Sequence, residues 1–191
     1  MKVLIIGSGG REHSIAWKIS QSEKLSKLYC APSNAGIDKI AERVNINVED
    51  IKSLTKFAKD NSIDLTIVGP EVPLSLGIVD KFNEHNLTIF GPDKKGAQIE
   101  SSKIFAKELM TKYNIPTANY ECFDDLQSSI NYLDKINYPV VVKYDGLAAG
   151  KGVTVCYDQQ EAKQALKDIF KKNNPRVIIE EFPKGKEVSI I

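Results

Sequence analysis

The sequence predicts an α/β protein in which an open parallel-sheet domain precedes a smaller α+β domain. Through about residue 92, short apolar runs that end in glycine alternate with amphipathic segments. This pattern is typical of buried parallel strands joined by crossover helices. From about residue 119, β-rich runs follow one another with fewer helices between them. We therefore place the first domain at residues 1–100, a connecting helix and linker at 101–118, and the second domain at 119–191.

Four apolar runs are predicted to form strands of the first domain, and a shorter alternating run is predicted to form an edge strand. The helix after the first strand has Ile15 and Ile19 one turn apart, and a helix from Ile51 follows Asp50, a favoured N-cap residue. The segment "SLGIVDKFNE" is predicted to be a further helix. The four runs are "KVLIIG", "KLYCA", "DLTIVGP" and "LTIFGP", and the edge run is "VNINV".

The connecting segment "SSKIFAKELMTKY" is predicted to be a helix that ends before Pro116. Its apolar residues Phe105, Leu109 and Tyr113 recur at four-residue spacing and share one face. We expect this helix to join the two domains.

The second domain is predicted to contain two helices and several strands. One helix has Leu126, Ile130 and Leu133 on one face, and the other runs to Phe170 behind a capping box in "DQQE". Because the chain ends within a strand pattern, we expect it to stop inside a longer protein. The predicted strands are "TANYECF", "PVVVKY", "GVTVCY", "RVIIEEF" and "KEVSII".

The composition argues against several classes of protein. The net charge is +1 and no lysine–arginine block interleaves with aromatic residues, so we expect no nucleic-acid partner. The start "MKVLIIGSGG" lacks the features of a signal peptide, and no run nears the ~18 apolar residues of a membrane span. The spacing of Cys30, Cys122 and Cys156 matches no redox or metal motif, which indicates reduced thiols in a cytoplasmic protein without a membrane partner.

The stretch "DGLAAGKGVTV" is glycine-rich and contains one lysine, but it does not fit a P-loop. Gly146 and Gly150 enclose three residues instead of four, Gly152 follows Lys151 where a hydroxyl is needed, and a strand follows instead of a helix. We predict the tip of a β-hairpin whose backbone N–H groups approach an anion, with charge from Lys151 and Lys143. The alternative is an ordinary hairpin with solvated lysines.

The stretch "GSGGREH" lies between a strand and a helix, as a dinucleotide-binding loop does. Glu12 stands at the third glycine position, and the acidic residue expected after the second strand is missing from "KLYCAPSN". These departures favour a single phosphate at the helix N-terminus over a dinucleotide. A structural tight turn is the alternative. His13 is interpreted as a helix residue with a local partner rather than a catalytic base.

The stretch "GPEVPL" lies just beyond the carboxyl end of a predicted strand, where open α/β sheets bind their ligands. Two prolines stiffen this stretch, and Glu71 has no basic neighbour in the sequence. A carboxylate there can hold an amine or a sugar hydroxyl. The alternative is a rigid surface turn.

These motifs occur in order with "SNAG", "FGP", "SSK", "VIIEEF" and "GKEVS". The combination resembles the ATP-grasp superfamily and, within it, the glycinamide ribonucleotide synthetases, or phosphoribosylamine–glycine ligases, of purine biosynthesis. The resemblance covers essentially the whole chain. It implies a Rossmann-like pre-ATP-grasp domain followed by the small ATP-grasp subdomain, with the larger ATP-grasp half expected beyond Ile191.

The resemblance implies a cytoplasmic ligase that uses ATP and magnesium. ATP phosphorylates the carboxylate of glycine, and the amine of 5-phosphoribosylamine attacks the acyl phosphate to give glycinamide ribonucleotide, ADP and phosphate. The magnesium ligands are expected beyond Ile191 and none within this chain, so we expect the chain alone to be inactive. We also expect a monomer.

By resemblance, Lys103 and Lys143 contact the ATP phosphates, and Lys143 and Lys151 are the catalytic candidates. Glu180, Glu181 and Phe182 form the hinge that binds adenine, and Glu187 accepts the ribose hydroxyls. The loop that closes over the phosphates contains Gly146, Ala148, Ala149, Gly150, Lys151 and Gly152.

The same resemblance assigns the phosphoribosylamine site to the first domain. Gly9 and Gly10 bind the phosphate, and Glu71 lies near the sugar or the amine. The remaining substrate-binding candidates are Glu12, Asn34 and Pro70.

Two positions depart from the family pattern: the turn "KKNNP" is shorter than expected, and Lys186 replaces an acidic residue. Two other hypotheses stay open. "KVLIIGSGG" suggests a dinucleotide-dependent oxidoreductase, although the missing acidic residue counts against it. The expected loss of the C-terminal half suggests a non-catalytic fragment that binds a nucleotide or a phosphoribosyl group.

Overall fold

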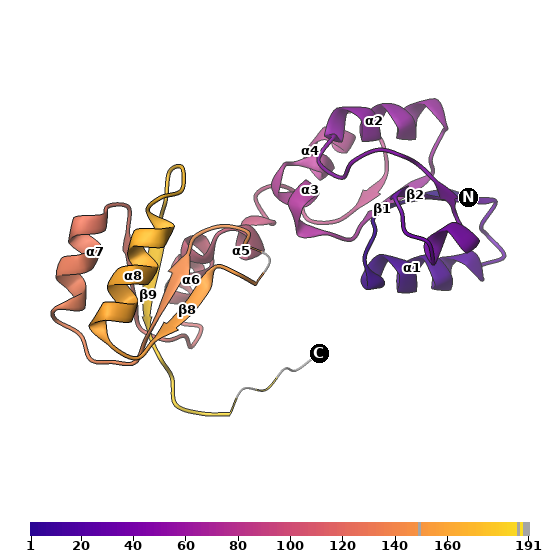
Figure 1. Cartoon of the computed structure of the whole chain (residues 1–191). Coiled ribbons are helices and arrows are strands. Elements are labelled where there is room, and N and C mark those ends of the chain that lie inside the picture. Colours follow the sequence, from indigo (N-terminus) through magenta and orange to yellow (C-terminus); the bar gives the residue numbers. More distant parts are fainter. Residues whose placement is uncertain (149, 187, 189–191) are drawn as a thin grey trace. The chain divides into compact units, whose positions relative to one another are not determined.

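The computed structural model describes residues 1–148, 150–186 and 188. The chain divides into two compact units, Met1–Gln98 and Ile99–Ile191 (Figure 1). Each unit has its own sheet and its own core of buried apolar side chains. The predicted connecting helix, α6 (Lys103–Lys112), falls within the second unit. Among the described residues, no helix is long and apolar enough to cross a membrane.

The first unit contains an open sheet with the strand order β3-β2-β1-β4-β5. Every pairing of neighbouring strands is parallel, as predicted. The central strand β1 is buried from its second residue onward, which agrees with helices on both faces of the sheet. The strands are β1 (Lys2–Gly7), β2 (Lys27–Pro32), β3 (Glu42–Arg43), β4 (Leu65–Val68) and β5 (Ile89–Phe90).

The alternation of side chains along β1 divides the core of the first unit in two. Leu4 and Ile6 pack in a cluster with residues of α2 and α4, whereas Val3 and Ile5 pack in a cluster with residues of α1. Asp50 caps α2 as predicted, because its side chain accepts a hydrogen bond from the Ser53 N–H at 3.0 Å. The helices of this unit are α1 (Gly10–Ser20), the 3₁₀ turn η1 (Ile37–Lys39), α2 (Ile51–Asp60), α3 (Glu71–Ser75) and α4 (Ile78–Glu84). The short helix α5 (Gln98–Ser101) begins at the last residue of this unit and lies mostly in the second.

The prediction of an edge strand at "VNINV" is wrong. The edge strand β3 precedes this run, and its backbone pairing ends where the Val44 N–H donates to the Cys30 carbonyl at 2.8 Å. Val44, Ile46 and Val48 pack into the core without joining a ladder. Their alternation therefore reflects contact with the core rather than strand pairing.

The single helix predicted at "SLGIVDKFNE" is also wrong. The segment contains the end of α3 and the whole of α4, separated by Gly77 with φ of +87°. Glycine adopts this left-handed backbone conformation without the steric cost that a Cβ imposes. Because α3 begins at Glu71, the stretch "GPEVPL" includes the start of a short helix.

The second unit contains a four-stranded antiparallel sheet with the order β6-β9-β7-β8, in agreement with the predicted α+β region. Residues of α7 and α8 cover one face of this sheet and form its apolar core. Asp158 caps α8, although the Glu161 carboxylate accepts a hydrogen bond from the Tyr157 N–H rather than from that of Asp158. The elements are β6 (Tyr120–Phe123), α7 (Leu126–Leu133), β7 (Val140–Tyr144), β8 (Val153–Cys156), α8 (Gln159–Ile169) and β9 (Val177–Glu181).

The predicted apolar face of α6 is not its buried face. Tyr113 is 61% exposed, whereas the buried residues of α6 are Ile104 and Lys107. A lysine is therefore among the most buried residues of this helix, and it needs a local charge partner. The strand predicted at "KEVSII" lies mostly outside the described residues.

We predict that Leu54→Ala destabilises the first unit by about 2 to 5 kcal/mol, because Leu54 is fully buried between α2 and the sheet. The matched control Leu76→Ala removes the same atoms from a residue that is 49% exposed, and it should change the free energy of unfolding far less. Urea unfolding followed by the fluorescence of Trp17, the only tryptophan, reports on this unit. Equal effects of the two substitutions would contradict the assigned core.

Candidate functional site

Three loops of the first unit meet at the carboxyl edge of its parallel sheet. They follow β1, β2 and β4, which are neighbours in the sheet. Their contacts join them directly: Asn34 Nδ2 donates to the Ser8 carbonyl at 2.8 Å, and Arg11 Nη2 lies 3.6 Å from Glu71 Oε2. The sequence predictions for this unit therefore converge on one edge, where open α/β sheets bind ligands.

Glu12 is folded beneath the backbone of this edge and is only 3% exposed. Its Oε2 accepts a hydrogen bond from the Gly9 N–H at 2.5 Å. Its Oε1 is buried and finds no hydrogen-bond partner in the described part of the chain. The side chain of Glu12 thus occupies the space beside the turn, which explains why the third glycine of a dinucleotide loop is absent here.

The position of the Glu12 side chain also explains why three neighbouring residues are glycine. A Cβ added at Gly7 would lie 2.6 Å from Glu12 Cγ, one at Gly9 would lie 2.8 Å from Oε2, and one at Gly69 would lie 2.0 Å from Oε1. These separations are shorter than van der Waals contact, so the buried carboxylate requires glycine around it. The motif "GSGG" therefore has a structural cause in addition to any ligand.

Gly10 differs from these three glycines because a Cβ added there would meet no atom within 4 Å. It is the first residue of α1, and its surroundings are open to solvent. The positive end of the helix dipole points to this position. The Arg11 side chain, which is 76% exposed, adds a nearby positive charge that the sequence analysis did not assign to the site.

Asn34 has few hydrogen-bonding groups left for a ligand. Its Oδ1 accepts from the Gly36 and Ile37 N–H groups at 2.8 and 3.0 Å. Its Nδ2 ties it to Ser8. The predicted substrate-binding role of Asn34 therefore stands beside a clear structural role, which is to join the loops after β1 and β2.

In the second unit, the glycine-rich stretch forms the predicted hairpin between β7 and β8. The Tyr144 N–H donates to the Gly152 carbonyl, and the Lys151 N–H donates to the Ala148 carbonyl, both at 2.8 Å. Gly146 and Gly150 have φ of +142° and +79°, which favour glycine. Ala149, also predicted to bind phosphate, lies outside the described residues.

Asp145 anchors the base of this hairpin to α6. Its Oδ1 accepts hydrogen bonds from the Ile104 N–H and the Ser102 hydroxyl, both at 3.1 Å. Its Oδ2 lies 2.5 Å from Arg176 Nη2. Asp145 is only 8% exposed, so these contacts compensate a buried charge and fix the position at which the glycine-rich loop begins.

Lys103 lies at the same place, where its Nζ donates to the Gly146 carbonyl at 2.8 Å. Burial lowers the pKa of the Lys103 ammonium, the Asp145 carboxylate opposes this shift, and the charge of Lys143 adds to it. Lys103 therefore reaches the backbone just beyond β7, the strand that carries Lys143. That both lysines approach one anion stays a prediction.

Lys143 and Lys107 flank the carboxylate of Glu180 on the face of the sheet opposite to α7 and α8. Lys143 Nζ lies 2.7 Å from Oε2, and Lys107 Nζ lies 3.2 Å from Oε1, an ion pair without hydrogen-bond geometry. The Glu180 side chain is only 5% exposed. The sequence analysis missed Lys107, although it follows Lys103 by one helical turn.

A second group of residues surrounds the predicted hinge. Glu181 Oε2 accepts from Asn119 Nδ2 at 3.0 Å, and Phe182 is 39% exposed. A pocket of about 490 Å³ lies beside them, and Glu187 lies outside the described residues. The pocket lining includes Asn119, Tyr132, Tyr138, Glu180, Glu181 and Phe182.

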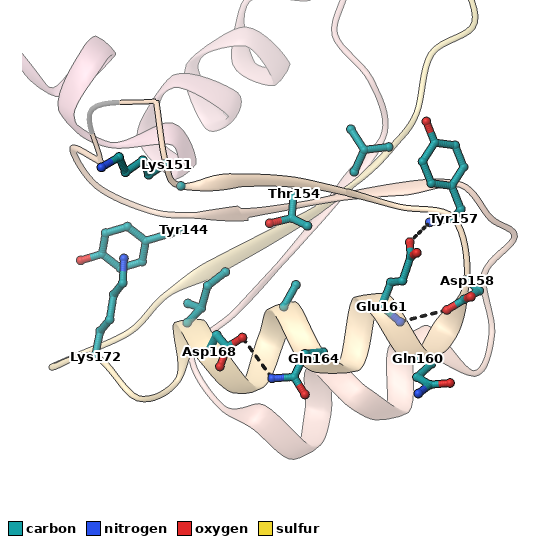
Figure 2. Close-up of a pocket in the computed structure, with 14 residues that line it drawn as sticks. Tyr144, Lys151, Thr154, Tyr157, Asp158, Gln160, Glu161, Gln164, Asp168 and Lys172 are labelled. Carbon is teal, nitrogen blue, oxygen red and sulfur yellow. Dashed lines mark hydrogen bonds between the residues drawn. The ribbon is translucent and has the colours of Figure 1, made fainter.

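Lys151 lines a different pocket, of about 870 Å³, between β8 and α8. Figure 2 shows Lys172 against the ring of Tyr144 in this pocket, with Nζ 3.9 Å from the ring centroid. Successive residues of a strand point to opposite faces, so Tyr144 and Lys143 lie on opposite sides of the sheet. The structure therefore does not bring Lys151 and Lys143 into one pocket.

Neither unit shows a metal-binding cluster in residues 1–148, 150–186 and 188, where no three His, Cys, Asp or Glu side chains gather. The three cysteines are free. Burial raises the pKa of the Cys30, Cys122 and Cys156 thiols to about 11, which leaves them protonated near neutral pH. We therefore assign no metal site and no reactive thiol to the described residues.

The comparisons with known proteins cover both units. The family model described as phosphoribosylglycinamide synthetase, N domain, matches residues 1–100, and the model for the ATP-grasp (A) domain of the same enzyme matches residues 101–191. Phosphoribosylamine–glycine ligase from Clostridium acetobutylicum is 50% identical over 196 residues, and that from Caldanaerobacter subterraneus subsp. tengcongensis is 54% identical over 195 residues.

Each of these alignments covers 100% of this chain and 47% of the relative, so the chain spans about half the length of the relatives it matches. The crystal structure of phosphoribosylamine–glycine ligase from Thermotoga maritima superposes with a TM-score of 0.77 at 30% identity. This superposition covers 97% of the chain and 45% of that protein. With both family models matched in order, the chain belongs to the phosphoribosylglycinamide synthetase family of ATP-grasp proteins.

Proposed function

We propose that the chain provides the phosphoribosylamine-binding domain and the small ATP-binding subdomain of a phosphoribosylamine–glycine ligase of purine biosynthesis. The reaction joins glycine to 5-phosphoribosylamine and gives glycinamide ribonucleotide, ADP and phosphate by way of glycyl phosphate. The names of the relatives and of both family models support this proposal. Among the structural observations, the pair of lysines at the base of the glycine-rich hairpin carries it.

ATP fits the chemistry of this lysine pair. Lys103 donates to the Gly146 carbonyl, Lys143 lies three residues before Gly146 in the chain, and Gly146 allows the backbone to approach a phosphate. The buried carboxylate of Glu180 is an acceptor that suits the amino group of adenine. Fixed charges of this kind, held away from bulk water, stabilise the charge that develops during phosphoryl transfer.

The first unit suits the second substrate. The N-terminus of α1 at Gly10 offers backbone N–H groups and a helix dipole to a phosphate, and Arg11 adds a cation. Glu71 is 41% exposed at the same edge, where its carboxylate can accept from a sugar hydroxyl or an amine. We assign Glu12 to holding this turn in place rather than to ligand contact, because its Oε2 is already bound to Gly9.

Magnesium, a cytoplasmic location and a monomeric state complete the proposal. Phosphoryl transfer from ATP depends on a divalent cation that neutralises the phosphates. The three free cysteines agree with a reducing compartment.

We predict that Lys143→Ala weakens ATP binding to the chain by roughly 10- to 100-fold, the usual effect of losing a charge-assisted hydrogen bond. The matched control Lys135→Ala removes an exposed lysine of the same unit and should leave the affinity unchanged. Titration calorimetry with ATP measures both variants. Equal affinity of Lys143→Ala and the unchanged chain would remove Lys143 from the site.

The ligase activity can be tested in a hybrid protein that joins this chain to the remaining part of the Clostridium acetobutylicum relative. We expect phosphate release from ATP that depends on both glycine and phosphoribosylamine, and we expect Lys143→Ala to abolish it. A hybrid that folds and binds ATP but shows no glycine-dependent release would argue against the proposed reaction.

We predict that Gly10→Val weakens the binding of ribose 5-phosphate, a stable substitute for phosphoribosylamine, and leaves ATP binding unchanged. A Cβ added at Gly10 meets no atom within 4 Å, so we expect valine to block the helix N-terminus without disturbing the fold. Calorimetry with each ligand and a thermal melt separate the two effects. If Gly10→Val bound ribose 5-phosphate as well as the unchanged chain, the phosphate site would lie elsewhere.

A further inference from the structure

Two lysines share the buried carboxylate of Glu180, but the protein holds them very differently. The side chain of Lys107 is 10% exposed, and that of Lys143 is 25% exposed. We propose that Lys107 is the permanent counter-ion of Glu180 and that it thereby allows Lys143 to leave Glu180 and bind a nucleotide phosphate. This inference rests on the proposed function.

Lys107 is fixed by neutral groups in addition to Glu180. Its Nζ donates to the Thr117 hydroxyl at 2.6 Å and to the Ala118 carbonyl at 3.3 Å. The same Nζ lies 5.3 Å from the centroid of the Tyr120 ring. These partners all belong to residues 117–120, which lead into β6. Moving the Lys107 ammonium would therefore break both of these hydrogen bonds as well as the ion pair with the buried carboxylate of Glu180.

Among the described residues, the Lys143 side chain makes one polar contact, the ion pair with Glu180 Oε2 at 2.7 Å. It projects from β7, which pairs with β9 on one side and β8 on the other. The backbone of Lys143 is thus rigid, whereas its ammonium can change partner by rotating the side chain. Lys143 is the exchangeable member of the pair.

A buried carboxylate that loses its only cation strongly destabilises the fold. A single lysine paired with Glu180 would therefore be held in place. With Lys107 present, Glu180 keeps one ammonium at 3.2 Å when Lys143 turns to a phosphate. The local charge of the three groups is +1, so one positive charge is available for an anionic ligand. Without Lys107, the phosphate would compete with Glu180 for the same lysine.

The test uses inorganic tripolyphosphate, which has the charge of the ATP phosphates and no adenine, so it is blind to any contact between Glu180 and the base. We expect Lys107→Met to weaken tripolyphosphate binding by about tenfold, because Lys143 then stays with Glu180. Lys107→Arg keeps the charge and should bind within about threefold of the unchanged chain. ATP binding should follow the same order.

The decisive variant combines Lys107→Met with Glu180→Gln, which removes the carboxylate that retains Lys143. We expect this double substitution to restore the affinity for tripolyphosphate to that of Glu180→Gln alone, a strong coupling between the two positions. If Lys107 acted only by stabilising the fold, removing Glu180 as well would not restore binding. Failure of the double substitution to restore binding in a folded chain would overturn the inference.

A second measurement needs no ligand. The rate at which acetic anhydride acetylates Lys143, read by mass spectrometry, reports how freely its amine leaves Glu180. We expect Lys107→Met to slow this labelling several-fold and the added Glu180→Gln to reverse the effect. Unchanged labelling in Lys107→Met would overturn the counter-ion role. If the unchanged chain bound neither ATP nor tripolyphosphate, the proposed function would fail, and labelling would still decide whether Lys107 controls Lys143.

Discussion

Both units are organised by the same constraint, which is that a carboxylate removed from water must find compensating donors or cations. Glu12, Asp145 and Glu180 are each less than a tenth exposed, and each lies at a candidate site. Glu12 is held by a backbone N–H, Asp145 by a mixture of N–H, hydroxyl and guanidinium groups, and Glu180 by two ammonium groups. The positions of the nearby loops and helices follow from these contacts.

The same buried carboxylates also determine features of the fold outside the candidate sites. Space for the Glu12 side chain requires glycine at three positions, one at the end of β1, one in the loop that follows β1 and one after β4. The contacts of Asp145 attach the start of α6 to the end of β7. Lys107 extends the attachment to β9 through Glu180. Residues that look like a ligand-binding motif in sequence thus also hold secondary-structure elements together.

Much of this architecture could be predicted from local pattern. The buried strands of the first unit, the antiparallel hairpin and the caps at Asp50 and Asp158 each depend on neighbouring residues, and the structure confirms them. The error at "VNINV" arose because apolar alternation does not show where strand pairing stops. The error at Gly77 arose because helical periodicity does not show where a helix is interrupted. Lys107 was missed for a related reason: its partner Glu180 is distant in sequence, and periodicity assigns a lysine to the solvent face.

The two candidate sites attract anions by different physical means. At Gly10 the positive potential comes from a helix terminus and from the exposed Arg11, whose charge dissolved salt screens. Around Glu180 the charges are buried, so salt screens them less, and an incoming phosphate must displace a carboxylate that is already bound to Lys143. Affinity in the second unit is therefore a difference between two ion pairs that share one lysine. In the proposed counter-ion arrangement, Lys107 remains with Glu180 in both states, which keeps that difference small enough for a ligand to reverse it.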